Sequence, residues 1–172
     1  MMRFFESKIV FVAVLVILAI SLYFYISNKY NTPSIAKNPD EYSSNYDANY
    51  NLTIKGADTL NGFKVAIVDT PATQEKGLMN IKHMNVENGL LFQFDEDQIQ
   101  TFWMKNTYIP LDMIFIDKDK KIINIAKNAE PLLETPTYSS VSNAKYVLEI
   151  NAYLCDRLNI QVGDIVDWTN GK

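Results

Sequence analysis

An uncharged apolar run near the N-terminus sets the strongest constraint on how this chain can fold. Between Ile9 and Ile26 no residue is charged, and the only polar groups are Ser21 and the tyrosine hydroxyls. At 1.5 Å per residue, a helix over this run is just long enough for the hydrocarbon core of a bilayer, which takes about 20 residues. The run therefore predicts a transmembrane helix over residues 9–26.

The flanks of this run indicate its orientation. Arg3 and Lys8 precede it, and Tyr23, Phe24 and Tyr25 lie at its far end, as interfacial aromatics do. The positive flank predicts a cytoplasmic N-terminus over residues 1–8, a single-pass protein of the cell membrane and a C-terminal domain outside it. The alternative is secretion after signal cleavage. Signal peptides have a shorter apolar core and a small-x-small cleavage site, so the bulky aromatics here favour an uncleaved anchor.

The remainder of the chain divides into a stalk, a domain and a tail. Residues 27–51 are polar, contain Pro33 and Pro39 and show no apolar period, which predicts a flexible stalk. A folded domain is expected over 52–168, followed by a C-terminal tail over 169–172. The total of 172 residues suits one domain with such additions.

Short apolar runs bounded by turn formers predict a mostly β fold. Thr70 and Pro71 have the pattern of an N-cap and first helical residue for a short helix that meets Gly77, and a second short helix is expected over 152–158. The pattern favours a compact α+β domain, an antiparallel β-sandwich or open barrel with one or two short helices. The expected strands are 63–68, 89–94 (ended by the acidic run 95–97), 102–105, 113–116, 121–126, 145–150 and 165–168.

Composition removes several classes of function. The formal charge is −4 and no basic stripe is interleaved with aromatics, so nucleic acid is not an expected partner. A single cysteine, Cys155, and a single histidine, His83, leave no intramolecular disulfide and no cysteine-rich zinc site. Cys155 is expected to be a small buried hydrophobe and His83 a surface residue. Neither a calcium loop nor a phosphate-cradling glycine loop is present, so no metal and no cofactor are predicted.

The densest group of polar side chains lies in the block Phe102–Thr107, closed by Pro110-Leu111-Asp112. If residues 107–110 form a hairpin loop, Lys105 lies opposite Asp112 with Cβ atoms about 5 Å apart, and Trp103 shares their face. An indole wall beside a paired ammonium and carboxylate suits a small polar ligand. The expected ligand-binding residues are Trp103, Lys105, Asn106, Thr107 and Asp112.

Two other interpretations of this block remain open. In the first, the domain is a hydrolase or lyase in which Asp112 or Glu130 is the acid or base and Lys105 stabilises charge. In the second, the block is structural or serves assembly: a surface salt bridge worth about 0–1 kcal/mol lies beside a packed Trp103, while Asn and Thr cap a turn.

Several short motifs occur in an order that resembles a known family. The ordered set looks like the bacterial and archaeal "uncharacterised ACR" family of unknown function, of which the block Phe102–Thr107 with Pro110-Leu111-Asp112 is the most distinctive signature. The resemblance implies one compact, mostly β domain, often behind an export signal or anchor, and it assigns no activity, substrate or cofactor. The other motifs are Asp69-Thr70-Pro71, Gly77-Leu78-Met79, Gly89-Leu90-Leu91-Phe92, Tyr146-Val147-Leu148-Glu149 and Gly163-Asp164.

Together these observations predict a membrane-anchored, extracytoplasmic binding or interaction module of the cell envelope. Its expected partner is a small polar ligand, a glycan or an envelope protein. A non-enzymatic role is favoured because no assembled nucleophile motif accompanies the polar block.

Overall fold

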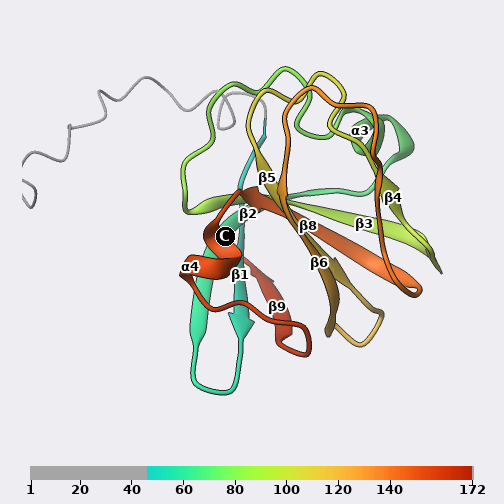
Figure 1. Ribbon diagram of the computed structural model, residues 1–172. Coiled ribbons are helices and arrows are strands. Elements are labelled where there is room, and N and C mark those ends of the chain that lie inside the picture. The colour runs from blue at the N-terminus through green and yellow to red at the C-terminus, as the bar shows by residue number, and fades with distance from the viewer. Residues whose placement is uncertain (1–45, 172) are drawn as a thin grey trace, which may run out of the picture. The chain divides into compact units, whose positions relative to one another are not determined.

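A computed structural model describes residues 46–171, in which one curled β-sheet carries the fold (Figure 1). The bounds of the described elements are β1 Tyr50–Lys55, β2 Leu60–Val68, α3 Pro71–Lys76, β3 Asn88–Gln98, β4 Thr101–Phe102, β5 Leu111–Ile116, β6 Ile122–Ala129, β7 Tyr138–Ser139, β8 Ala144–Asn151, α4 Leu154–Arg157 and β9 Ile165–Asn170. The strands of the main sheet pair in the order β6-β5-β8-β3-β2-β1-β9. A separate small sheet pairs β4 with β7.

The main sheet is curled far enough for its two edge strands to approach each other at one end. Lys121, just before β6, forms an isolated antiparallel bridge with Ile165 at the start of β9. The Ile122 N–H also donates to the Asp164 carbonyl oxygen at 2.9 Å. The result is a half-barrel, in which the sheet has a concave and a convex face.

Both faces of the sheet bury apolar side chains, because neighbouring residues of a strand point to opposite sides. On β3, Leu91 lies in the concave core, whereas Leu90 and Phe92 lie in the convex core. The concave core contains inward-facing side chains from all seven strands of the main sheet, together with Leu154 and Cys155 of α4. The convex core is covered by loops that contribute Leu78, Ile81, Met84, Met104 and Ile109.

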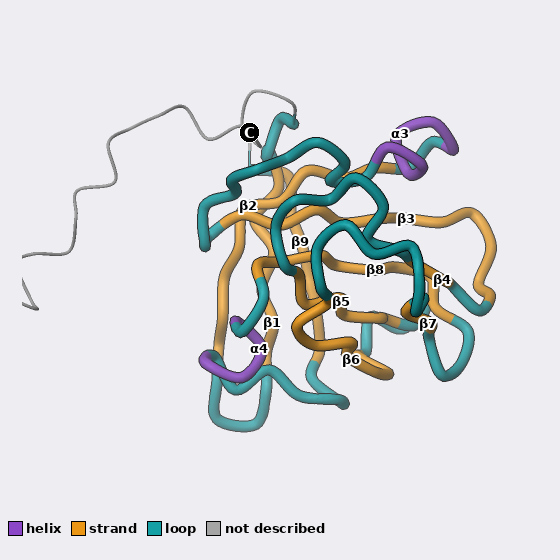
Figure 2. The backbone as a smooth tube through the Cα atoms, turned by 45° about the horizontal axis from the view of Figure 1, so that its top comes forward, coloured by secondary structure: helices purple, strands orange, loops and turns teal. Residues whose placement is uncertain are grey.

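The two short helices lie at opposite ends of the domain (Figures 1 and 2). Helix α3 begins as predicted: Thr70 is the N-cap, Pro71 follows it, and the Thr73 N–H donates to the Thr70 hydroxyl at 3.3 Å. Gly77 ends the helix with φ +42°, a conformation that side-chain-bearing residues rarely adopt. The chain therefore turns sharply after α3 and runs back across the convex face.

The predicted mostly β class with two short helices is confirmed, and several details differ. The main sheet is a single curled sheet, and β2 and β3 pair in parallel because residues 69–87, including α3, form the crossover between them. Strand β3 continues through the acidic run to Gln98, in which Asp95 and Glu96 are exposed and Asp97 is half-buried. The strand expected over 102–105 is only β4, which pairs with β7, and β1 begins at Tyr50 inside the predicted stalk.

The predicted transmembrane helix over residues 9–26 lies outside the described residues. Within 46–171, no helix has the length and hydrophobicity needed to cross a bilayer. The anchor and its orientation stay predictions from the sequence.

Candidate functional site

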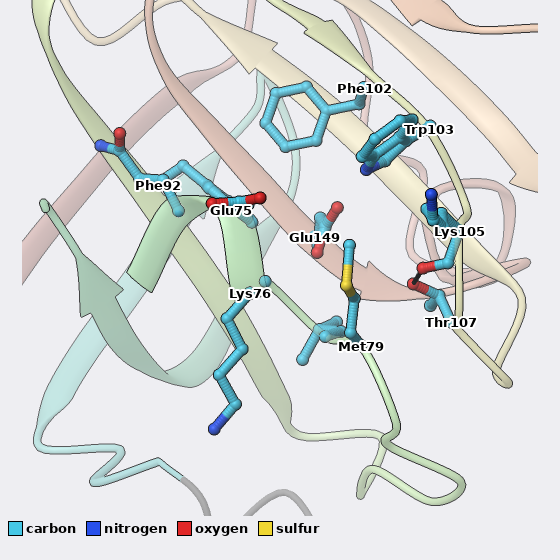
Figure 3. Close-up of a pocket in the computed structure, with 12 residues that line it drawn as sticks. Glu75, Lys76, Met79, Phe92, Phe102, Trp103, Lys105, Thr107 and Glu149 are labelled. Carbon is cyan, nitrogen blue, oxygen red and sulfur yellow. Dashed lines mark hydrogen bonds between the residues drawn. The ribbon is translucent and has the colours of Figure 1, made fainter. Parts of the chain in front are cut away.

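A pocket beside Trp103 lies between α3, with the turn that follows it, and the segment that leaves β4 (Figure 3). Its cavity volume is about 30 Å³, and two larger hollows, of about 250 and 360 Å³, share Trp103 and Glu75 with it. The lining residues are Gln74, Glu75, Lys76, Gly77, Leu78, Met79, Phe92, Phe102, Trp103, Lys105, Thr107 and Glu149.

The floor of this pocket contains a buried carboxyl group, Glu149 of β8. Its side chain is 4% exposed, and among the described residues its Oε2 atom has no hydrogen-bond partner. Figure 3 shows Glu149 in the middle of the lining side chains, with Phe102 and Trp103 on one side and Met79 on the other. Burial raises the pKa of Glu149 from 4.5 to about 8, so the carboxyl is mostly protonated at neutral pH.

Aromatic rings form one wall of the pocket. The Phe92 and Phe102 rings meet edge to face, with centroids 4.9 Å apart and planes at 88°. Trp103 continues this wall toward the solvent and keeps 43% of its surface exposed. Tryptophan side chains are highly buried on average, so the exposure of Trp103 at the edge of this pocket is unusual.

The two lysines at the mouth have partners of their own. Lys105 Nζ lies 3.5 Å from Glu134 Oε1 and 5.1 Å from the centroid of the Trp103 ring. Lys76 Nζ lies 5.4 Å from the centroid of the Tyr46 ring. The Tyr46 hydroxyl donates to the Gly77 carbonyl oxygen, and burial, with the nearby Glu149 charge as the smaller cause, raises the pKa of Tyr46 to about 12.

Asn106 and Thr107 form a structural corner behind the pocket. Asn106 has φ +54°, and its carbonyl oxygen accepts from the Asn80 N–H at 2.8 Å. Thr107 is 5% exposed; its hydroxyl donates to the Lys105 carbonyl at 3.3 Å, and its carbonyl accepts from the Leu132 N–H. These bonds fix the turn that places Trp103 and Lys105 at the mouth, and Thr107 itself lines the pocket.

Asp112 lies on the other face of the sheet, so the predicted ion pair with Lys105 is wrong. Asp112 is fully buried, and its two carboxylate oxygens accept from the N–H groups of Asn128 and Cys155, each at 2.9 Å. The reason is the strand pairing: β5 pairs with β6 and β8, with Asp112 opposite Ile150 of the concave core. No hairpin between β4 and β5 forms, and Asp112 instead holds α4 and a bulge of β6.

The carboxylates of the catalytic hypothesis do not converge. Glu130 is exposed, and its N–H donates to the Tyr138 hydroxyl at 3.3 Å. Neither Glu130 nor Asp112 lines the pocket that contains Lys105. The geometry therefore offers no site in which Asp112 or Glu130 works together with Lys105.

Glu149 was missed as a site residue although the motif Tyr146-Val147-Leu148-Glu149 was singled out. The two-residue period places Glu149 on the same face as Val147, which belongs to the convex core. Leu148 and Ile150 belong to the concave core, so β8 is buried on both sides. A charged residue in a strand that is apolar on both faces is the signal that would have found it.

The remaining candidate residues have structural positions. His83 is exposed, as expected. Cys155 is a free, fully buried thiol, as expected, and burial together with the neighbouring Asp112 carboxylate raises its pKa. Across residues 46–171, no group of three or more His, Cys, Asp and Glu side chains is placed to hold a metal ion.

These features define a small, mostly β domain with a buried carboxyl in an aromatic-walled pocket. The chain belongs to the DUF192 family, described as "Uncharacterized ACR", whose model matches residues 52–168. It is similar to a UPF0127 protein of Thermococcus sibiricus, with 30% identity over 110 residues that cover 61% of this chain and 66% of that protein. The match therefore spans slightly less than two thirds of that relative.

Two crystal structures resemble the domain. A protein of unknown function from Novosphingobium aromaticivorans is 40% identical, with a TM-score of 0.67 over 69% of this chain and 84% of that chain. A Sinorhizobium meliloti protein, provisionally described as a transcription regulator, is 34% identical, with a TM-score of 0.67 over 72% of this chain and 95% of that chain. The shared family confirms the resemblance seen in the sequence motifs.

Proposed function

We propose that the domain is a non-enzymatic binding module whose ligand enters the pocket between α3 and Trp103. The observation that carries the proposal is the Glu149 Oε2 atom, which is buried at the pocket floor without a hydrogen-bond partner. Leaving a buried polar group unpaired costs about 1–3 kcal/mol. A ligand that hydrogen-bonds this oxygen recovers that cost when it binds.

The walls suit a small ligand with an apolar part. Phe92, Phe102 and Trp103 offer ring surface, while Thr107 and Glu149 offer polar atoms. Six of the twelve lining residues are polar or charged, so the pocket offers ring surface beside several hydrogen-bonding groups, the two elements that small-molecule sites combine. The site therefore keeps Trp103, Lys105 and Thr107 from the predicted set, adds Glu149, and leaves Asp112 and Asn106 with structural roles.

The test is a fragment screen by two-dimensional amide NMR on the full-length protein. We expect bound fragments to shift the signals of Gly77, Thr107 and the Trp103 indole, and Trp103→Ala to abolish those shifts. Trp168→Ala is the matched control because Trp168 packs against Tyr146, with ring centroids 4.8 Å apart, outside the pocket. Fragments that bind equally well to a folded Trp103→Ala variant contradict the proposal.

We also propose that this module works outside the cytoplasmic membrane, anchored by residues 9–26. The support is the uncharged apolar run with Arg3 and Lys8 before it. Added protease should remove a C-terminal tag from intact spheroplasts and leave an N-terminal tag whole. A C-terminal tag that resists the protease until the cells are lysed overturns this location.

A further inference from the structure

The chemistry of the pocket floor narrows the class of ligand. Among residues 46–171, Glu149 is the one carboxyl group that lines the pocket from within the core; Glu75, on α3, is exposed at the mouth. An anionic ligand placed against Glu149 gains no ion pair there and requires the carboxyl to stay protonated. A cationic ligand gains an ion pair with the carboxylate in a site where the charge is little screened by water.

The aromatic wall of the pocket also favours a positively charged ligand. Phe92, Phe102 and Trp103 line the pocket together with Glu149, and Figure 3 shows Phe102 and Trp103 on one side of it. A cation within about 6 Å of an aromatic face is attracted by the ring quadrupole, and the attraction is larger when the cation is desolvated. A carboxylate beside several rings is a combination that selects an organic ammonium over a neutral molecule of the same shape.

The charged groups at the mouth add little net charge to the pocket. Lys105 pairs with Glu134, Lys76 lies over Tyr46, and the exposed Glu75 carboxyl lines the same mouth. The charge of the ligand is therefore set by the carboxyl at the floor, Glu149, which matches one positive charge. A metal ion is a poor fit because one carboxylate supplies too few oxygen ligands.

We infer that the pocket binds a small organic monocation, with its ammonium group on the Glu149 carboxylate and its alkyl part against Phe102 and Trp103. This inference rests on the proposed binding function and names its ligand class. On binding, the Glu149 carboxyl releases its proton to the solvent and the ligand ammonium takes the place of that proton. Affinity therefore rises with pH until Glu149 is ionised in the free protein.

Burial of Glu149 sets the pH range of this effect. The titratable groups around it in the described structure are Tyr46 from the segment before β1, Glu75 and Lys76 from α3, and Lys105 after β4. The pKa of Tyr46 is raised to about 12, so this phenol stays neutral below that range. Glu149 is consequently the group whose ionisation we expect to control binding between pH 6 and 9.

The experiment measures quenching of Trp103 fluorescence in the full-length Trp168→Phe protein, which leaves Trp103 as its only tryptophan. The probes are n-butylammonium, 1-butanol and butyrate, which share one alkyl chain and differ in charge. We expect n-butylammonium to bind about tenfold or more tightly than 1-butanol at pH 9, with a smaller ratio at pH 6. Butyrate should be the weakest of the three.

Two variants separate Glu149 from the general charge of the surface. Glu149→Gln should remove the preference for n-butylammonium and its pH dependence, whereas Glu96→Gln, at an exposed position of β3 that does not line the pocket, should retain both. The pH comparison in the reporter protein needs no Glu149 variant, so it decides the matter even if Glu149→Gln folds poorly.

The possible failures are distinguishable. If 1-butanol or butyrate quenches Trp103 as well as n-butylammonium does, the cation inference is overturned while the pocket proposal stands. If none of the three probes quenches Trp103, the cation inference is also overturned, and the fragment screen decides the pocket proposal by itself.

Discussion

Two buried carboxyl groups, Asp112 and Glu149, lie on neighbouring strands and differ in their hydrogen bonding. Asp112 of β5 stands opposite Ile150, and the next pair along the ladder joins Met113 to Glu149 of β8. This single-residue step places the two side chains on opposite faces of the sheet. Asp112 accepts two backbone N–H groups at 2.9 Å, whereas Glu149 Oε2 has no partner in the described structure.

The difference separates a residue that the fold needs from one that the fold tolerates. Asp112 satisfies the backbone at the start of α4 and at a β6 bulge, so its charge contributes to stability. Glu149 is buried with an unpaired oxygen beside aromatic rings, so it lowers the stability of the fold as the pH rises above about 4.5. A residue that costs stability and faces a pocket is better explained by binding than by architecture.

The largest expected effect is the pH dependence of stability caused by Glu149. Its pKa is about 4.5 unfolded and about 8 folded, so the folded state binds more protons between these values. Stability contributed by this group is present below pH 4.5 and declines by up to about 1.4 kcal/mol per pH unit until pH 8. Urea unfolding of Glu149→Gln should show a flatter pH profile, with Glu75→Gln as the unchanged control.

Loss of Asp112 is the next largest effect. Asp112→Ala should lower the free energy of unfolding by about 3 kcal/mol, because two buried hydrogen bonds to a carboxylate are lost. The matched control is Asp117→Ala, since Asp117 also accepts two backbone N–H groups at 2.9 Å, from Asp119 and Lys121, but in an exposed turn. Equal losses in the two variants, measured by urea unfolding, would show that burial adds nothing at Asp112.

A smaller effect on stability is expected at Gly77, which lines the same pocket as Glu149. An added Cβ there meets the Phe92 ring at 3.3 Å and must accept φ +42°. Gly77→Ala should therefore cost about 1–2 kcal/mol. Gly62→Ala is the control, because its Cβ meets only a carbonyl oxygen at 3.9 Å; thermal unfolding that ranks Gly62 as the costlier site contradicts the account.

The smallest effect is expected at Lys105. Its ion pair with Glu134 is exposed, with side chains 40% and 58% accessible, so Lys105→Met should change stability by less than about 0.5 kcal/mol. Asp112 is not its partner, so the double variant Lys105→Met with Asp112→Ala should be additive within about 0.5 kcal/mol. A large coupling energy between Lys105 and Asp112 would contradict the observed strand pairing and support a hairpin that places them opposite each other.

Asp112 and Glu149 also show which parts of the fold and of the site can be predicted from the sequence. Local signals were sufficient for Thr70 and Pro71 at the start of α3, and short apolar runs predicted most strands. The face of Asp112 depended on which strands pair, and β5 pairs with β6 and β8, both farther along the chain than the assumed partner at 102–105. Trp103 and Thr107 were found because polar and aromatic residues cluster there, while Glu149 joins them only through the tertiary fold.

The central claim is that Glu149 is a protonated carboxyl at neutral pH, held at the floor of the Trp103 pocket. A carbon-13 NMR titration of glutamate side-chain carboxyls, with the Glu149 signal assigned from Glu149→Gln, measures this directly. The account predicts that the Glu149 carboxyl titrates with a pKa near 8. A Glu149 signal that titrates near the ordinary value of 4.5 would contradict the account.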